Sequence, residues 1–174
     1  AAQGKVDAFF LSGGQIDGAA NINLTGVGGY PQSEARWSGA FGSAFLYFQV
    51  PRVILFRERH ERRAFPERVD FVTSPGTSPE GTWRRGGPHA LVTELCVFAF
   101  DKAEGRFGLE SLHPGVTAAE VREATGFDYD APADVPETEA PDAESLALIR
   151  GEVADALAGV YPEFAARVFA REAA

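Results

Sequence analysis

Three loops contain the residue types that bind small polar ligands: glycine, serine and asparagine. They span residues 13–23, 38–44 and 73–76, and each follows or joins an apolar segment. Open α/β sheets bind ligands in crevices at strand ends, where backbone amides are free. These loops therefore favour a ligand site at the end of a sheet. Ordinary turns have the same composition, so the residues alone leave both interpretations open.

Motifs for other chemistries are missing from the sequence. It has no dinucleotide-binding or phosphate-loop glycine motif, no nucleophile elbow, and no histidine or cysteine spacing typical of a metal site. His60, His89 and His113 are far apart in different predicted elements, so we expect structural or surface histidines. Cys96 lies in an apolar run, which predicts a small buried side chain rather than a reactive thiol.

Basic residues gather around His60. The arginines of this cluster are Arg52, Arg57, Arg59, Arg62, Arg63 and Arg68. One interpretation is a solvated face in which they pair with Glu58, Glu61 and Glu67. The other is contact with phosphates or with an acidic partner subunit.

The overall charge limits the class of partner. A formal net charge of -9 and a pI near 4.8 argue against nucleic acid or an anionic membrane surface, because both require a broad basic face. No apolar run approaches the length of a membrane helix, and the first residues lack a basic region followed by an apolar one. We therefore expect a cytoplasmic protein.

Apolar runs bounded by glycine, proline and polar residues predict strands. These runs span residues 5–12, 21–25, 53–56, 69–73, 90–100 and 106–112. Residues 77–88 are rich in glycine, proline, serine and arginine, which predicts a long loop. The first strand is nearly continuously apolar, as in a sheet covered on both faces.

Helices are predicted mainly in the second half of the chain. Residues 45–48 could open a helix or a buried turn. Thr117 and Glu120 have the spacing of a capping box, which predicts a helix to Thr125 that ends at Gly126. Residues 128–142 are acidic and proline-rich, typical of an extended surface connector, and residues 143–174 have helical spacing with a second segment from Pro162. Together these elements predict one α/β domain over residues 1–174, a layered sheet with flanking helices.

Four elements, in order, resemble a known family. Residues 15–25 look like the Q-x-D-x-x-G-N-x-N-x-T segment of glutaconate-type, family I coenzyme A transferase B subunits. Residues 60–65 resemble that family's H-E-K-R-R-F element, and residues 69–76 its I-D-Y-V-T-S-P-G element. Residues 110–117 and 121–127 match its C-terminal signature. The resemblance covers residues 6–150, the C-terminal two-thirds of such a B subunit.

The resemblance implies a fold, a partner and a reaction. The fold is that of the CoA-transferase and ribose-isomerase-like superfamily, and the partner is a separate CoA-transferase A subunit. Family members use coenzyme A as a substrate and no further cofactor. Their catalytic glutamate attacks an acyl-CoA, becomes a glutamyl-CoA thioester, and passes CoA to a second carboxylic acid.

The catalytic glutamate implied by the resemblance has no counterpart in this sequence. It lies in an E-S-G or E-N-G motif upstream of the strand at which this chain begins, and neither motif occurs in the 174 residues. We expect that the N-terminal portion of the domain is missing. The alternatives are that another polypeptide supplies it, or that the protein does not transfer CoA.

The glycine-rich loop also departs from the family pattern G-S-G-G-A-N, whose backbone amides can stabilise the thioester oxyanion. Gly39 and Gly42 remain, but Phe41 takes a glycine position, which predicts a narrower backbone approach. The resemblance therefore leaves two alternatives. One is a ring-opening acyl-CoA hydrolase of steroid catabolism that lacks the glutamate, and the other is a non-catalytic scaffold subunit.

The resemblance implies a set of substrate-binding residues and no catalytic residue in this chain. Their expected role is to position the acyl-CoA through polar side chains, backbone donors and a strand end. The residues are Gln15, Asn21, Asn23, Gly39, Gly42, Ser43, Ser74 and Gly76.

Overall fold

The computed structural model of the chain describes residues 1–169. Contacts divide the chain into two units, Ala1–Thr138 and Glu139–Ala174. The first contains the sheet and the second is helical, and each is described by itself. The predicted helical stretch beyond residue 169 lies outside the described residues.

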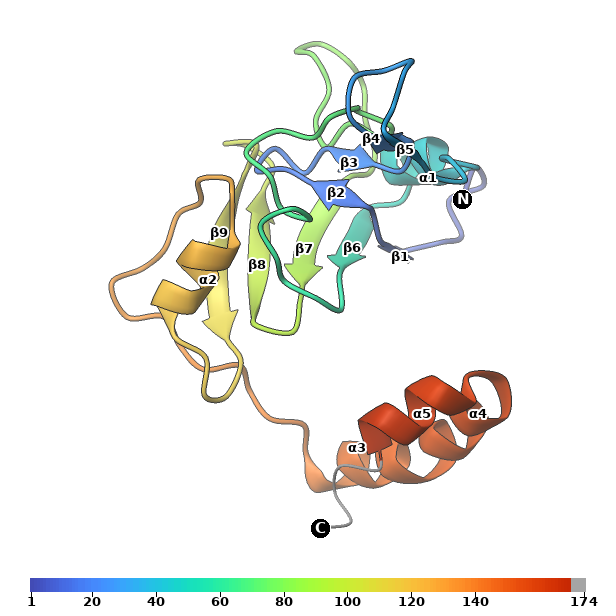
Figure 1. Ribbon diagram of the computed structural model, residues 1–174, viewed down its shortest axis with the longest axis vertical. Coiled ribbons are helices and arrows are strands. Elements are labelled where there is room, and N and C mark those ends of the chain that lie inside the picture. The colour runs from blue at the N-terminus through green and yellow to red at the C-terminus, as the bar shows by residue number, and fades with distance from the viewer. Residues whose placement is uncertain (170–174) are drawn as a thin grey trace. The chain divides into compact units, whose positions relative to one another are not determined.

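The first unit is built on a five-stranded mixed sheet in the order β1-β6-β7-β8-β9 (Figure 1). Its strands are β1 (Ala8–Leu11), β6 (Arg52–Phe56), β7 (Pro88–Val92), β8 (Cys96–Asp101) and β9 (Arg106–Leu112). The pairs β1 with β6 and β6 with β7 are parallel, whereas β7, β8 and β9 are antiparallel neighbours. An α/β fold with a layered sheet is thus confirmed.

One face of this sheet packs into the hydrophobic core. In β8, Cys96 and Phe98 are fully buried and alternate with half-buried residues. An aromatic cluster covers them: the Phe107 and Phe127 rings are stacked with centroids 5.6 Å apart, and the Tyr129 ring lies 4.9 Å from that of Phe98. Burying rings of this size makes a large apolar contribution to the stability of the fold.

The opposite face of the sheet is apolar and only partly covered. Cross-strand partners form a row in which phenylalanine and isoleucine give way to small residues, in the order Phe10, Ile54, Ala90, Ala99 and Gly108. The Phe10 side chain is 64% exposed at the edge strand.

Two short hairpins precede the central strands. Strands β2 (Gln15–Ile16) and β3 (Ile22–Asn23) form one, and β4 (Gly26–Val27) and β5 (Ala35–Arg36) form the other. Helix α1 (Ser43–Gln49) then leads into β6, so the structure has the helix rather than the buried turn among the two alternatives for residues 45–48.

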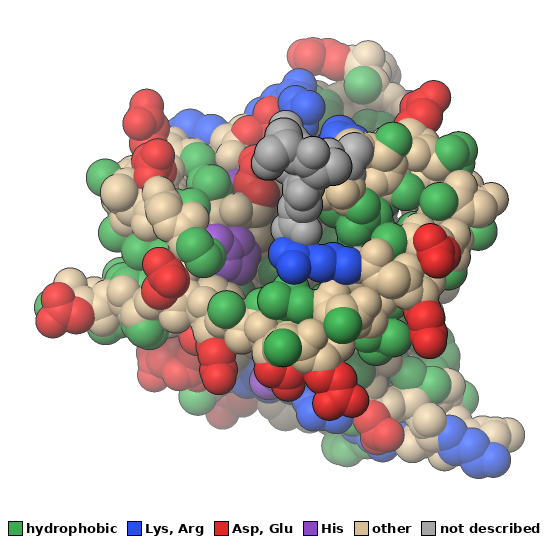
Figure 2. Space-filling view, turned by 90° about the horizontal axis from the view of Figure 1, so that it is seen from below, with side chains coloured by type: hydrophobic (Ala, Val, Ile, Leu, Met, Phe, Trp, Pro, Cys, Tyr) green, Lys and Arg blue, Asp and Glu red, His purple; other side chains and the backbone are tan. Residues whose placement is uncertain are grey.

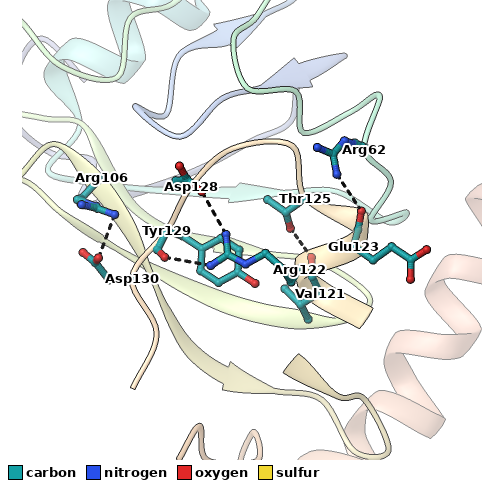
Figure 3. A network of polar contacts seen from close by, with 9 residues as sticks. All are labelled: Arg62, Arg106, Val121, Arg122, Glu123, Thr125, Asp128, Tyr129 and Asp130. Atoms are coloured by element: carbon teal, nitrogen blue, oxygen red, sulfur yellow. Dashed lines mark hydrogen bonds and ion pairs between the residues drawn. The ribbon is translucent and has the colours of Figure 1, made fainter. Parts of the chain in front are cut away.

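Helix α2 (Ala118–Ala124) begins with the predicted capping box, in which the Thr117 hydroxyl accepts from the Glu120 backbone N–H. Figure 3 shows how its far end is fixed. Arg122 donates to the Asp128 carboxylate at 3.4 Å and to the Tyr129 carbonyl oxygen at 3.3 Å, and its guanidinium lies 3.8 Å from the Tyr129 ring centroid. Residues 128–138 then run beside β9, where Asp130 forms a bridge with Gly108.

Three predicted strands differ from the structure. Residues 90–100 are not one strand, because a turn at Thr93 separates β7 from β8. The Thr93 hydroxyl accepts from the Leu95 and Cys96 backbone N–H groups and so closes this turn. Residues 21–25 form a strand only at Ile22–Asn23.

The predicted strand at residues 69–73 is wrong. Its first backbone N–H groups bind side chains: Val69 donates to the Asp17 carboxylate and Asp70 to the Gln15 side-chain oxygen. Thr73 donates to the Ile22 carbonyl oxygen of β3, where the adjacent Ser74 forms an isolated bridge with Ile22 and no ladder follows. An apolar run here reflects burial of Val69 rather than a ladder.

The second unit is a helical hairpin. Its segments are α3 (Ala143–Leu148), the π-helical turn η1 (Ile149–Val153), α4 (Ala154–Val160) and α5 (Pro162–Phe169). Asp142 caps the first helix by accepting from the Ser145 backbone N–H at 2.7 Å. The predicted helices at 143 and 162 are confirmed up to residue 169. No helix among the described residues is long and apolar enough to cross a membrane.

Candidate functional site

Buried amide side chains fix the end of the first predicted loop and the residues that follow it. Asn23 is fully buried, and its amide nitrogen donates to the Gln15 side-chain oxygen at 2.8 Å and to the Gly26 carbonyl at 2.7 Å. Its amide oxygen accepts from the Thr25 and Gly26 backbone N–H groups. All four hydrogen-bonding positions of the Asn23 side chain are therefore used inside the protein.

A second set of contacts fixes the end of the third loop. The Asn21 amide donates to the Asp17 carboxylate at 3.1 Å, and its oxygen accepts from the Gly76 backbone N–H at 3.1 Å. An added Cβ at Gly76 would overlap the Ala19 carbonyl oxygen, so the two loops touch there without space for a side chain. Only glycine permits this approach.

Hydroxyl groups connect the same loops to helix α1. The Thr25 and Thr73 hydroxyl oxygens lie 2.8 Å apart, and those of Ser43 and Ser74 lie 3.2 Å apart. Ser43 and Ser74 are both buried, and Ser43 is the first residue of the helix. The structure thus brings six predicted residues into one connected loop network: Gln15, Asn21, Asn23, Ser43, Ser74 and Gly76.

The two remaining predicted residues lie beside this network. Gly39 has a φ of +96° and Gly42 is the N-cap of α1, and neither has a neighbour that an added Cβ would meet. Phe41 between them has a φ of 48° and a side chain that is 89% exposed. The loop therefore keeps a left-handed backbone at the phenylalanine, and the ring points into solvent.

A pocket on one side of the network contains part of the arginine cluster. It has a volume of about 510 Å³ and includes Gln15, Glu34 and Trp37 with Arg57 and Arg63. The Arg57 guanidinium donates to the Gly13 carbonyl at 2.6 Å, and Arg63 forms an ion pair with Glu61 at 2.9 Å. One of the two interpretations of this cluster was that its arginines pair with neighbouring glutamates. Arg63 forms such a pair.

A pocket on the other side borders Gly76. It has a volume of about 210 Å³, with Arg84 and Lys102 among its walls and three hydroxyl residues, Thr77, Ser78 and Thr82. Sequence reasoning missed this pocket because residues 77–88 predict a loop and nothing more. The adjacent Arg84-Arg85-Gly86-Gly87 run was the available signal.

Two of the three histidines, His60 and His113, have hydrogen-bonding contacts inside the protein that give them a structural role. The His60 ring is buried, with its nitrogens 2.9 Å from the Thr93 and Thr125 hydroxyls, and burial lowers its pKa to about 4. His113 contacts the carbonyl of the same Thr93 at 2.9 Å. Their positions in the sequence had indicated that His60 and His113 are far apart. The structure instead brings both rings to Thr93, because the turn at this residue joins their elements.

Cys96 is fully buried, and burial raises the pKa of its thiol to about 12. The predicted burial of this small side chain is confirmed. The raised pKa disfavours the reactive thiolate form.

The charge on the surface agrees with the composition. Figure 2 shows acidic side chains spread over the visible face, with basic side chains in smaller separate groups. Among the described residues, no cluster of histidine, cysteine and carboxylate side chains could hold a metal ion.

Known proteins share both sequence and fold with this chain. The chain is 36% identical over 151 residues to the B subunit of glutaconate CoA-transferase from Acidaminococcus fermentans, covering 83% of this chain and 56% of that protein. It is 34% identical to the cholesterol ring-cleaving hydrolase IpdB subunit of Rhodococcus jostii, covering 83% and 58%. The crystal structure of the decarboxylase AibA/AibB superimposes with a TM-score of 0.73 at 28% identity, covering 85% of this chain and 57% of that one.

The chain thus spans a little more than half the length of the relatives it matches. These relatives carry the names of a transferase, a hydrolase and a decarboxylase, so similarity alone does not select one chemistry. A family model described as Coenzyme A transferase matches residues 1–124. With that match over most of its sheet unit, the chain belongs to the coenzyme A transferase family.

Proposed function

We propose that this chain forms part of the B subunit of a heteromeric CoA-transferase, which moves CoA between an acyl-CoA and a carboxylic acid. The proposed transferase is of the glutaconate or 3-oxoacid type. One observation carries the proposal: the loop at 39–42 keeps a left-handed backbone beside the buried contact between Ser43 and Ser74. Backbone N–H groups in such a loop can stabilise the oxyanion of a thioester under attack.

In this function the residues of the loop network act by position. Gln15, Asn21 and Asn23 use their amide groups to fix the two loops. Ser74 places the third loop against α1, and Gly76 places it against the first loop. The nucleophile is a glutamate that these 174 residues do not supply, because the E-S-G and E-N-G motifs are absent from them. A CoA-transferase A subunit is the expected partner, and coenzyme A is a substrate rather than a bound cofactor.

A hydrolase is the second candidate. Phe41 stands where the transferase pattern has glycine, and the hydrolase relative is nearly as similar as the transferase relative. A hydrolase needs an activated water and forms no glutamyl thioester, so the two candidates differ in a covalent intermediate.

Trapping that intermediate tests the proposal. The native complex is isolated, its chains are identified by intact mass spectrometry, and it is treated with an acyl-CoA followed by hydroxylamine or borohydride. A transferase gives a modified glutamate, and it gives CoA exchange with a second acid. Consumption of the acyl-CoA with oxygen from water in the product and no modified glutamate favours the hydrolase. A complex without turnover of either kind contradicts both and leaves the scaffold role.

A further inference from the structure

The pocket beside Gly76 has an unusual charge arrangement. Its walls include two cationic side chains, Arg84 and Lys102, and no aspartate or glutamate. Neither cation forms an ion pair within the part of the chain that the structure describes. Two positive charges thus share one small cavity without a compensating carboxylate, in a chain whose net charge is -9.

Arg84 is held rigidly in this pocket. Its guanidinium donates to the carbonyl oxygens of Gly86 at 3.0 Å, Pro75 at 3.0 Å and Tyr47 at 3.2 Å, and to the Ser78 hydroxyl at 3.3 Å. The carbonyl groups satisfy its donors but do not neutralise its charge. The side chain therefore contributes a fixed positive charge whose position costs no further ordering when a ligand binds.

Lys102 is held less completely. Its ammonium donates to the Pro51 carbonyl at 3.1 Å, which leaves further donors for a ligand. Burial and the nearby Arg84 both lower the pKa of Lys102, so the two cations affect each other across the pocket. A bound anion would remove this repulsion.

The remaining wall supplies neutral donors. Thr77, Ser78 and Thr82 line the pocket with hydroxyl groups, and the Ser78 oxygen already accepts from Arg84, which leaves its own hydrogen to donate. A phosphate group carries nearly two negative charges and three acceptor oxygens, whereas a carboxylate carries one charge and two oxygens. Two cations together with several hydroxyls suit a phosphate better than a carboxylate.

We propose that the pocket formed by Arg84, Lys102 and the hydroxyls of residues 77–82 binds a phosphate group of coenzyme A. The assignment of the ligand to CoA rests on the proposed function. Gly76 belongs both to this pocket and to the loop network, so a CoA molecule held here by a phosphate lies against the same loop that positions Ser74. The 3′-phosphate and the diphosphate of CoA share the required chemistry.

Lysine substitution tests the pocket on the native complex. Lys102→Gln removes the charge without disturbing the carbonyl contacts of Arg84, and Lys102→Arg restores it. Lys5→Gln is the matched control, because Lys5 is the one other lysine of the chain and does not line the pocket. We expect Lys102→Gln to weaken CoA binding about tenfold in isothermal titration calorimetry, with Lys102→Arg and Lys5→Gln close to wild type.

A comparison of CoA with 3′-dephospho-CoA identifies the phosphate. If Lys102→Gln weakens CoA binding but not dephospho-CoA binding, the pocket holds the 3′-phosphate. Equal weakening of both assigns it to the diphosphate. Unchanged CoA binding in Lys102→Gln, or equal weakening in Lys5→Gln, would overturn the proposal.

Amine labelling separates the pocket from the proposed function. An acylating reagent modifies Lys5 and Lys102, and mass spectrometry quantifies each. Inorganic pyrophosphate and CoA should each protect Lys102 and leave Lys5 reactive. Protection by pyrophosphate without protection by CoA supports the phosphate pocket and overturns its assignment to CoA. If neither ligand protects Lys102, the proposal of a phosphate site in this pocket is overturned. The proposed transferase function would still be established by a trapped glutamyl thioester.

Discussion

At the scale of single residues, His60 is a structural histidine that makes stability depend on pH. Its ring binds the Thr93 and Thr125 hydroxyls, and the Cys96 sulfur lies 3.9 Å away as a neutral thiol. The Glu94 carboxylate accepts from the His60 backbone N–H rather than from the ring. Nothing in these contacts compensates a positive charge on the ring, so the folded protein favours neutral His60.

This arrangement predicts acid destabilisation. The pKa of His60 is lowered from 6.5 to about 4 on folding, so the unfolded chain binds a proton first as the pH falls. The contribution of His60 to stability is therefore complete above pH 6.5 and is lost between pH 6.5 and 4. The loss reaches about 3 kcal/mol at pH 4, and urea denaturation measured from pH 7.5 to 4 detects it.

His60→Gln is the control variant. Its carboxylates titrate as in the wild type, so a difference in the pH dependence of the unfolding free energy reports on His60. The variant starts less stable, but its unfolding free energy should fall less steeply over this range. Parallel curves for the two proteins would contradict the prediction.

Residue types indicated three loops as a ligand site, and the resemblance supplied the residues within them. The structure joins six of these residues in one loop network, and their role in substrate binding stays a prediction. Their partners were not predictable, because Asn23 and Gln15 bind each other rather than facing outward. Arg84 and Lys102 were missed since they are 18 positions apart and meet only through the packing of the loop at 77–87.

At the scale of elements, local patterns predicted well the bounds of β9 and the start of α2. The strand at 106–112 has the predicted bounds, and the capping box begins α2 as expected. Residues 69–73 have the same alternation, but the side chains of Asp17 and Gln15 accept the backbone N–H groups of Val69 and Asp70. Competition of this kind depends on tertiary contacts that no local window contains.

The contact between the loops makes Gly76 a sensitive position. In Gly76→Ala the new Cβ would overlap the Ala19 carbonyl and lie 2.7 Å from the Ala20 carbonyl, so backbone must move. We expect a loss of about 2 to 4 kcal/mol in the free energy of unfolding, measured by chemical denaturation.

Gly29→Ala is the control for this change. Its new Cβ would meet nothing within 4 Å, and we expect a change below about 0.5 kcal/mol. Equal effects of the two substitutions would show that the loop contact at Gly76 does not contribute to stability.

At the scale of the whole molecule, the two units differ in how much they bury. The hydrophobic core lies within the sheet unit, whereas Ala165 is the one buried residue among the described residues of the helical unit. That unit exposes many large apolar side chains, namely Leu148, Ile149, Val153, Val160, Tyr161, Phe164 and Val168. Short helices without a packed face are marginal in water.

Separating the units tests this difference. A chain ending at Thr138 should have a thermal unfolding midpoint within about 4 °C of that of the full chain, because its hydrophobic core is intact. Residues 139–174 alone should show weak helical circular dichroism. A large drop in the unfolding midpoint of the truncated chain, or strong helical circular dichroism of the isolated peptide, would contradict this prediction.

The loop network also has a consequence for the order of folding. The bonds that join its two loops, such as Leu24 to the Thr73 hydroxyl and Asn21 to Gly76, link residues 49 to 55 positions apart. Contacts of such long sequence separation pay a large loop-closure entropy and slow the approach to the native state. The β8–β9 hairpin closes across the short turn at residues 102–105 and can form early. A refolding chain therefore forms this hairpin before it acquires a ligand site, and recovery of ligand binding should lag behind the first recovery of secondary structure.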